Sequence, residues 1–214
     1  MASYPSVTTY SPSAASATAY GTAVTGTSFT LANTATADGL ARQILFTNNT
    51  ANSKSGINMT LVGTDADGYA QTEVLAGPGS STTTTSVKFY KTLTSVTPAS
   101  TFGADTMGIG TNGVWYTPTI PLNARNANAA VIQALLSGTC TFTVSQLYDD
   151  VLLTTSSPAQ SANWTAITAL GSKSATTVGS AAVGATAVRL SSASYSTGAS
   201  ISLSINQPWT TVRA

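Results

Sequence analysis

Short β-prone runs recur along the chain with turn-forming residues between them, and this rhythm restricts the fold more than any other feature. In the clearest run, Ile201, Leu203 and Ile205 alternate with serines, which is the pattern of a strand with one buried face. A spacing of about 8–12 residues between runs is typical of antiparallel sandwiches rather than of parallel sheets with helical crossovers. We therefore predict an all-β fold of two antiparallel β-sandwich-like domains. Other runs lie at residues 28–31, 43–47, 57–61, 72–75, 86–91, 114–116, 139–148 and 187–190.

Residues 1–27 differ from the rest, because they are rich in Ser, Thr, Ala and Gly and show neither helical nor sustained strand periodicity. We expect an extended N-terminal arm that becomes ordered against a neighbouring molecule. Pro118 and Pro121 then indicate a boundary, which places the two domains at residues 28–122 and 123–214. A single large domain fits the length almost as well. Within the second half, residues 128–136 fit a short helix as an alternative to a strand.

Two segments carry turn chemistry. Asn112-Gly113, set between two β-prone stretches, matches the positive-φ pair that a two-residue hairpin needs. Asp65-Ala66-Asp67-Gly68 supplies a turn after residues 57–61, and it also has the first two oxygen ligands of a calcium-binding loop. However, Tyr69 stands at the third ligand position and no Glu follows at the twelfth, so we favour a plain turn.

The chain contains very little charge, and this excludes several classes of partner. Charged residues make up 7% of the sequence, against about 25% in ordinary soluble domains, and the net charge is +1. Such a chain has no field that would attract nucleic acid or an anionic membrane. No apolar run of about 20 residues and no basic, apolar leader after Met1 is present, so we expect neither a membrane span nor secretion. A near-neutral surface resists association only weakly, which favours assembly.

Catalytic chemistry has little support. The absence of histidine removes Ser-His and Cys-His nucleophile pairs and His-ligated zinc. Glycoside cleavage would need two facing carboxylates, and adjacent Asp149-Asp150 point to opposite faces of an extended chain, so we favour a turn there. We therefore predict no enzyme and no catalytic, cofactor-binding or metal-binding residues. The remaining carboxylates are Asp38, Asp65, Asp67, Glu73 and Asp105.

Other motifs also have structural readings. Cys140 lies in an alternating run and is expected to be a buried strand residue. Gly108-Ile109-Gly110 lacks the third glycine and the helix of a dinucleotide site. The formal glycosylation acceptors at Asn48, Asn58 and Asn163 are discounted, because no leader directs the chain to the glycosylation machinery.

Aromatic residues offer one alternative to pure assembly. They could form a sugar-stacking platform, although core and interface packing is the favoured reading. The residues concerned are Trp115, Trp164, Trp209, Tyr69, Tyr90 and Tyr195.

A family resemblance is carried by several segments, which are similar to β-rich virion proteins of tailed bacteriophages. They are residues 61–73, 77–79, 87–97, 108–113 and 138–150, together with Asn163-Trp164 and residues 188–190. The resemblance implies a non-enzymatic virion structural protein, either a β-sandwich head decoration or head fibre or a neck or tail component. Its partners would be copies of itself and other virion proteins, such as the major capsid or tail proteins. Assembly would take place in the cytoplasm of the host bacterium. The alternative is a receptor- or carbohydrate-binding fibre module with a surface glycan as its partner.

Overall fold

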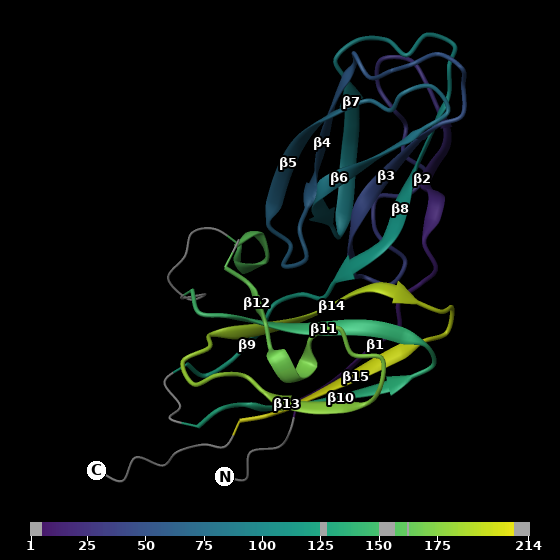
Figure 1. The fold of residues 1–214 in the computed structure, drawn as a ribbon. Coiled ribbons are helices and arrows are strands. Elements are labelled where there is room, and N and C mark those ends of the chain that lie inside the picture. The colour runs from purple at the N-terminus through teal and green to yellow at the C-terminus, as the bar shows by residue number, and fades with distance from the viewer. Residues whose placement is uncertain (1–5, 125–127, 150–156, 162, 208–214) are drawn as a thin grey trace. The chain divides into compact units, whose positions relative to one another are not determined.

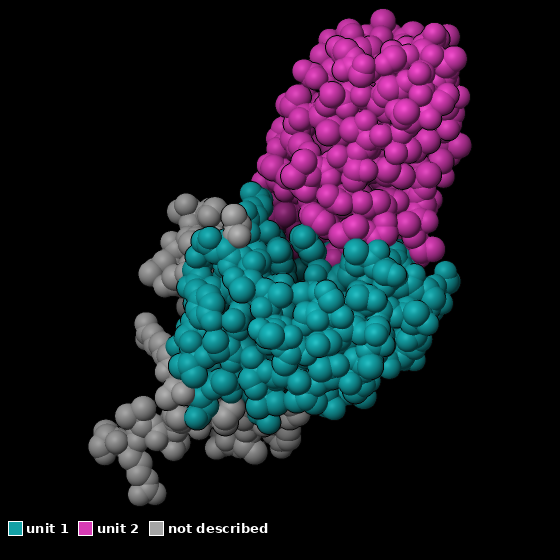
Figure 2. All heavy atoms as spheres, in the orientation of Figure 1, with its two compact units in different colours: residues 1–13, 116–214 teal, residues 14–115 magenta. Residues whose placement is uncertain are grey.

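The computed structural model describes residues 6–124, 128–149, 157–161 and 163–207. Its regular structure there consists of β-strands and two short 3-10 turns, η1 (Pro158–Gln160) and η2 (Thr168–Leu170). The strand pairs are antiparallel, which confirms the predicted all-β, sandwich-like fold class. The chain forms two compact units, which Figure 2 shows in different colours: unit 1 comprises residues 1–13 and 116–214, and unit 2 comprises residues 14–115.

Unit 2 encloses its core between two sheets. One sheet joins β2, β8, β3 and β6 in that order, and the other joins β5, β4 and β7 (Figure 1). Apolar residues of both sheets, such as Ile44, Phe46, Leu61 and Leu93, are fully buried in one cluster. The strands are β2 (Ser16–Val24), β3 (Ala41–Asn48), β4 (Asn58–Thr64), β5 (Ala70–Ala76), β6 (Thr83–Tyr90), β7 (Thr92–Pro98) and β8 (Met107–Tyr116).

Unit 1 is built in the same way. A four-stranded sheet has the order β1-β15-β10-β13, and a second group has the order β12-β11-β14 with β9 beside β14. Buried Phe142, Leu190 and Leu203 belong to different strands of these two groups. The strands are β1 (Ser6–Tyr10), β9 (Ile120–Pro121), β10 (Val131–Ser137), β11 (Cys140–Leu147), β12 (Thr165–Ala166), β13 (Thr177–Ser180), β14 (Ala187–Tyr195) and β15 (Ser200–Asn206).

The prediction of an extended arm over residues 1–27 is wrong for the part of this segment that the structure describes. Residues 6–10 form β1, which pairs with β15 from Ser6 opposite Ile205 to Tyr10 opposite Ile201. Residues 16–24 form β2, which pairs with β8 through two irregularities in register. The alternation is hidden in β1 because its faces are largely exposed, and in β2 because the irregularities in register break the period of two.

The units also divide the chain at a different place from the expected boundary at residue 122. The division falls between Trp115 and Tyr116, inside the continuous strand β8. Because β8 runs through this point, the division lies before Pro118 and Pro121 rather than after them. The first residues of the chain belong to unit 1 because β1 completes the sheet that holds β15.

Asn112-Gly113 does not form the predicted hairpin, since both residues lie within β8. The Asn112 side-chain amide donates to Gln43 Oε1 at 2.7 Å, and Asn112 Oδ1 accepts from the backbone amide of Val114 at 3.0 Å. These bonds give the polar side chain partners inside a strand. The turn at Asp65–Gly68 is confirmed between β4 and β5, and residues 131–137 are strand rather than helix.

Candidate assembly surfaces

The outer side of the four-stranded sheet in unit 1, which we call the unit 1 face, carries no charged residue. Strands β1, β10, β13 and β15 consist of apolar, hydroxyl and amide residues alone. One row across the sheet reads Val7, Ser204, Gln133 and Val178, and the two valines at its ends are 61% and 55% exposed. Large apolar side chains therefore stand in water on this face without ionic neighbours on its strands.

The three-stranded sheet of unit 2 presents a similar surface, the unit 2 face. Its outer rows place Val74 beside Thr60 and Thr97, and Val62 beside Thr72 and Ser95. Val74 and Val62 are exposed. The charged residue of these strands, Glu73, is the register partner of buried Leu61 and so lies on the other side. Each unit thus exposes one sheet face of valine and hydroxyl side chains.

Three edge strands of unit 2, namely β7, β6 and β2, are covered by their own chain. Outside β7, the Leu93 amide donates to the Thr34 carbonyl at 2.9 Å, and Ala35 bridges to Thr92. At β6, the Glu73 carboxylate accepts from the backbone amides of Val87 and Lys88 at 2.7 and 3.1 Å. These contacts saturate backbone groups that would otherwise pair with another chain.

The edge of β2 is covered in the same way. The Ala32 amide donates to the Tyr20 carbonyl at 2.7 Å, and the Asn33 side-chain amide donates to the Ala19 carbonyl at 2.9 Å. By contrast, among the described strands β1 pairs with β15 alone, so β1 forms an edge of its sheet.

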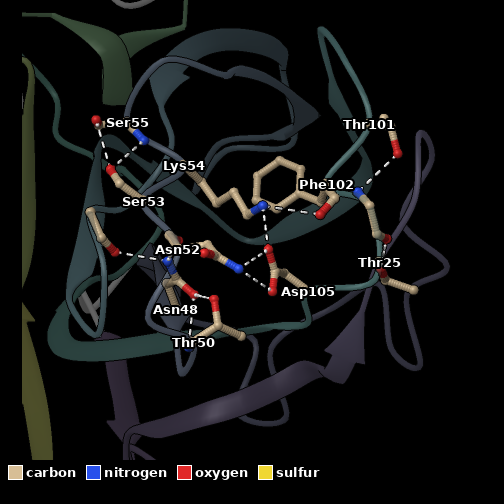
Figure 3. A network of polar contacts seen from close by, with 12 residues as sticks. Thr25, Asn48, Thr50, Asn52, Ser53, Lys54, Ser55, Thr101, Phe102 and Asp105 are labelled. Carbon is tan, nitrogen blue, oxygen red and sulfur yellow. Dashed lines mark hydrogen bonds and ion pairs between the residues drawn. The ribbon is translucent and has the colours of Figure 1, made fainter.

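A polar network fastens two loops of unit 2 (Figure 3). Lys54 Nζ lies 2.5 Å from Asp105 Oδ2, and it also donates to the Phe102 carbonyl at 3.1 Å. The Asn52 amide donates to both carboxylate oxygens of Asp105 at 3.1 Å. The hydrogen bond from Lys54, followed by that from Asn52, lowers the pKa of the Asp105 carboxyl. The arrangement holds an ionised carboxylate in place and offers no activated nucleophile.

An arginine in unit 1 lies between two aromatic rings. The Arg189 guanidinium carbon is 4.1 Å from the centroid of the Tyr116 ring and 4.4 Å from that of the Trp164 ring. Trp164 Nε1 donates to the Pro158 carbonyl at 2.9 Å, and Arg189 Nη1 donates to the Ala159 carbonyl at 3.3 Å. Each ring thus contacts the guanidinium, and these contacts fix the segment of η1 against β14.

The aromatic residues that the structure describes do not assemble the alternative sugar-stacking platform. Trp115 and Tyr90 are fully buried, and Tyr69 is exposed at the turn after β4. Trp164 contacts Arg189, while the Tyr195 hydroxyl donates to the Ser13 carbonyl at 2.8 Å. Trp209 lies outside the described residues.

The carboxylates have structural partners. Asp65 Oδ1 accepts from the Asp67 and Tyr69 amides within the turn. Asp149 accepts from Ser161 Oγ at 2.5 Å and from the Asn163 amide, and these bonds lower the pKa of its carboxyl. Asp150 lies outside the described residues. Among residues that the structure describes, no cluster of three or more potential metal ligands occurs.

The other singled-out residues also have structural roles. Cys140 is buried, its thiol lies 3.3 Å from Ser192 Oγ, and burial raises its pKa. Gly110 allows β2 to approach β8, because a Cβ at this position would lie 2.0 Å from the Ser16 carbonyl oxygen. Of the formal glycosylation acceptors, Asn48 is buried, and its amide donates to the carbonyls of Asn52 and Gly79. Asn58 and Asn163 are exposed.

Sequence reasoning missed the edge strand β1 and the buried Arg42–Asp38 pair. The run Ser6-Val7-Thr8-Thr9-Tyr10 contains the β-branched and aromatic residues that favour strands, and this was the available signal. In the described part of the chain, no helix has the length and apolar character to cross a membrane. Comparison with protein-family models, curated proteins and solved structures finds no significant match.

Proposed function

We propose that this protein is a non-enzymatic structural component of a bacteriophage particle that assembles with copies of itself and with neighbouring particle proteins. Its place would be the head surface, as a decoration or head fibre, or the neck or tail. The observation that carries the proposal is the uncharged sheet face exposed by each unit. The resemblance to virion proteins of tailed phages, whose segments include β4, β5, β7 and β11, supports the choice of particle.

Such faces suit permanent association. Burying apolar area gains about 25 cal/mol per Å², and a standard interface of about 1,600 Å² removes a large apolar surface from water. Because the faces carry no charge, association needs no desolvation of ions, which often offsets the gain from a buried ion pair. Serine and threonine hydroxyls can rotate to pair with polar groups of a partner. We therefore expect association that is insensitive to salt.

The first test measures the mass of the purified full-length chain by light scattering after gel filtration at about 0.05 M and about 1 M salt. A mass that is the same multiple of the 21.6 kDa chain in both buffers is expected. Leu135→Lys on the unit 1 face and Val74→Lys on the unit 2 face identify which face is used. The matched control is Val183→Lys, since the exposure of Val183 lies between those of Leu135 and Val74 but the residue lies between β13 and β14.

A chain that is monomeric in both buffers and does not bind to particles lacking it would contradict the proposal. The receptor- or carbohydrate-binding alternative has less support, because the aromatic residues are dispersed and two of them are buried. Binding of the monomeric chain to a glycan array would favour that alternative.

A further inference from the structure

We propose that β1 is the edge through which two copies of this chain pair, strand against strand, about a two-fold axis at Thr8. This inference rests on the proposed assembly function and names the partner and the contact. Antiparallel pairing would place Ser6 opposite Tyr10 of the second copy and Val7 opposite its Thr9. Residues 6–10 would thereby all take part in the pairing.

The first observation is the contrast between edges. In unit 2, the edges of β7, β6 and β2 are covered by backbone or side-chain bonds from the same chain. Natural proteins also protect edge strands with lysine, proline, bulges or very short length. β1 has five residues, no charge, no proline and a regular register with β15. It is therefore an edge suited to pairing.

The second observation is the exposure of β1 on both faces. Thr8 is the register partner of Leu203, which is buried, yet Thr8 itself is exposed. Val7 and Thr9, on the opposite side, are also exposed. Tyr10 at the end of β1 is half-buried, but the other residues of the strand add little to the core of unit 1. A further strand beside β1 would cover part of the surface that β1 leaves open.

The third observation identifies the second copy as the occupant. A strand that pairs with itself needs to be free of like charges at facing positions, and β1 meets this condition because it has no charged residue. A second copy would also continue the uncharged unit 1 face across the new pair, with Val7 beside Thr9 of the neighbour. Pairing about a two-fold axis is closed, so it consumes the edge without producing fibres.

The opposite edge of the sheet is less suited to the same role. β13 has four residues and contains Gly179. A Cβ added at Gly179 would lie 2.7 Å from Leu170 Cγ. Short strands with glycine pair weakly. This difference gives the test a matched control at Val178.

The test is site-specific cross-linking of the full-length chain. In the proposed pair, the two Thr8 residues face each other with Cα atoms about 4.5–5.5 Å apart, which a disulfide can span. Thr8→Cys should therefore yield a covalent dimer under mild oxidation, whereas Val178→Cys should remain monomeric on a denaturing gel. The native Cys140 is buried and stays reduced in both. Absence of the Thr8→Cys dimer, or equal cross-linking of both variants, would overturn the proposed pairing.

A charge exchange tests the register independently. Val7→Lys with Thr9→Lys places two pairs of like charges across the axis and should raise the dimer dissociation constant about tenfold or more. Val7→Lys with Thr9→Glu places opposite charges there and should restore dimers. Loss of dimers in both variants would overturn the register. If both double variants stay associated while Leu135→Lys is monomeric, the assembly function stands and the β1 contact fails.

Discussion

Arg42 and Asp38 form an ion pair inside unit 2, with 2.6 Å between Arg42 Nη2 and Asp38 Oδ2. Their side chains are only 1% and 6% exposed. Arg42 Nη1 also donates to the Asn112 carbonyl at 3.3 Å, and Asp38 Oδ1 accepts from the Leu40 amide at 3.1 Å. This ion pair is therefore placed where water can solvate neither charge well.

Asp38→Asn should destabilise unit 2 strongly, because it removes the carboxylate that pairs with the buried Arg42 guanidinium. The free energy of unfolding should fall by about 3–5 kcal/mol. The control is Asp105→Asn, which breaks the more exposed pair with Lys54 and should cost much less stability. Urea unfolding at pH 7 gives both values. If both variants lose the same small amount of unfolding free energy, the buried pair stabilises the fold no more than the exposed pair does.

Tyr20 should make unit 2 sensitive to alkali. Its side chain is fully buried, its hydroxyl has no hydrogen-bond partner among the described residues, and burial raises its pKa from 10.0 to about 12. Above pH 10 the unfolded chain loses this proton while the folded chain keeps it. The stabilisation is therefore complete below pH 10 and is lost progressively as the pH rises towards 12.

Tyr20→Phe should remove this contribution. Its denaturant midpoint should equal or exceed that of the wild type at pH 7 and exceed it clearly at about pH 11, because phenylalanine does not titrate and leaves no unpaired hydroxyl. Burial also raises the pKa of Tyr90, so Tyr20→Phe should still lose part of its stability at alkaline pH. Tyr69→Phe, at an exposed position, serves as the control. If the difference in midpoint between Tyr20→Phe and the wild type is the same at both pH values, the proposed role of Tyr20 is contradicted.

Gly110→Ala should be costly, because the new methyl group would lie 2.0 Å from the Ser16 carbonyl oxygen and 2.3 Å from the Ala17 carbonyl carbon. Since these are backbone atoms of β2, the strand would have to move. We expect a loss of about 1–3 kcal/mol in unfolding free energy. Gly56→Ala, which meets no heavy atom within 4 Å, is the matched control and should stay within about 1 kcal/mol of wild type. Comparable stability of the two variants would contradict the close approach of β2 and β8.

The strands with regular alternation were predictable from the sequence. Ile201, Leu203 and Ile205 are buried as their spacing indicates, and Met59 and Leu61 are buried in the other unit. β1 was not predictable in this way, because exposure of both its faces removes the alternation, and its partner β15 lies at the far end of the chain. The edge contact depends on this long-range pairing, so local patterns do not indicate it.

Local turn chemistry was outweighed at Asn112. The Asn-Gly pair favours a hairpin in isolation, but β8 pairs with β2 on one side and has β3 on the other. The side-chain bonds of Asn112 to Gln43 and to the Val114 amide satisfy its polar groups within the sheet. Tertiary pairing therefore decided the conformation. The uncharged faces could be expected from composition, whereas their division between two units could not.

The contacts of Arg189 with Trp164 and Tyr116 should stabilise unit 1 through the planar guanidinium. Arg189→Lys keeps the charge but loses the flat stacking surface, so we expect a loss of about 1 kcal/mol in unfolding free energy. A double-mutant cycle with Arg189→Met and Trp164→Leu separates the contact from the effects of each substitution and should give a coupling of at least about 0.5 kcal/mol. Urea unfolding followed by circular dichroism supplies all four values, since it does not depend on Trp164 fluorescence. Additive losses would mean that the two side chains stabilise unit 1 independently.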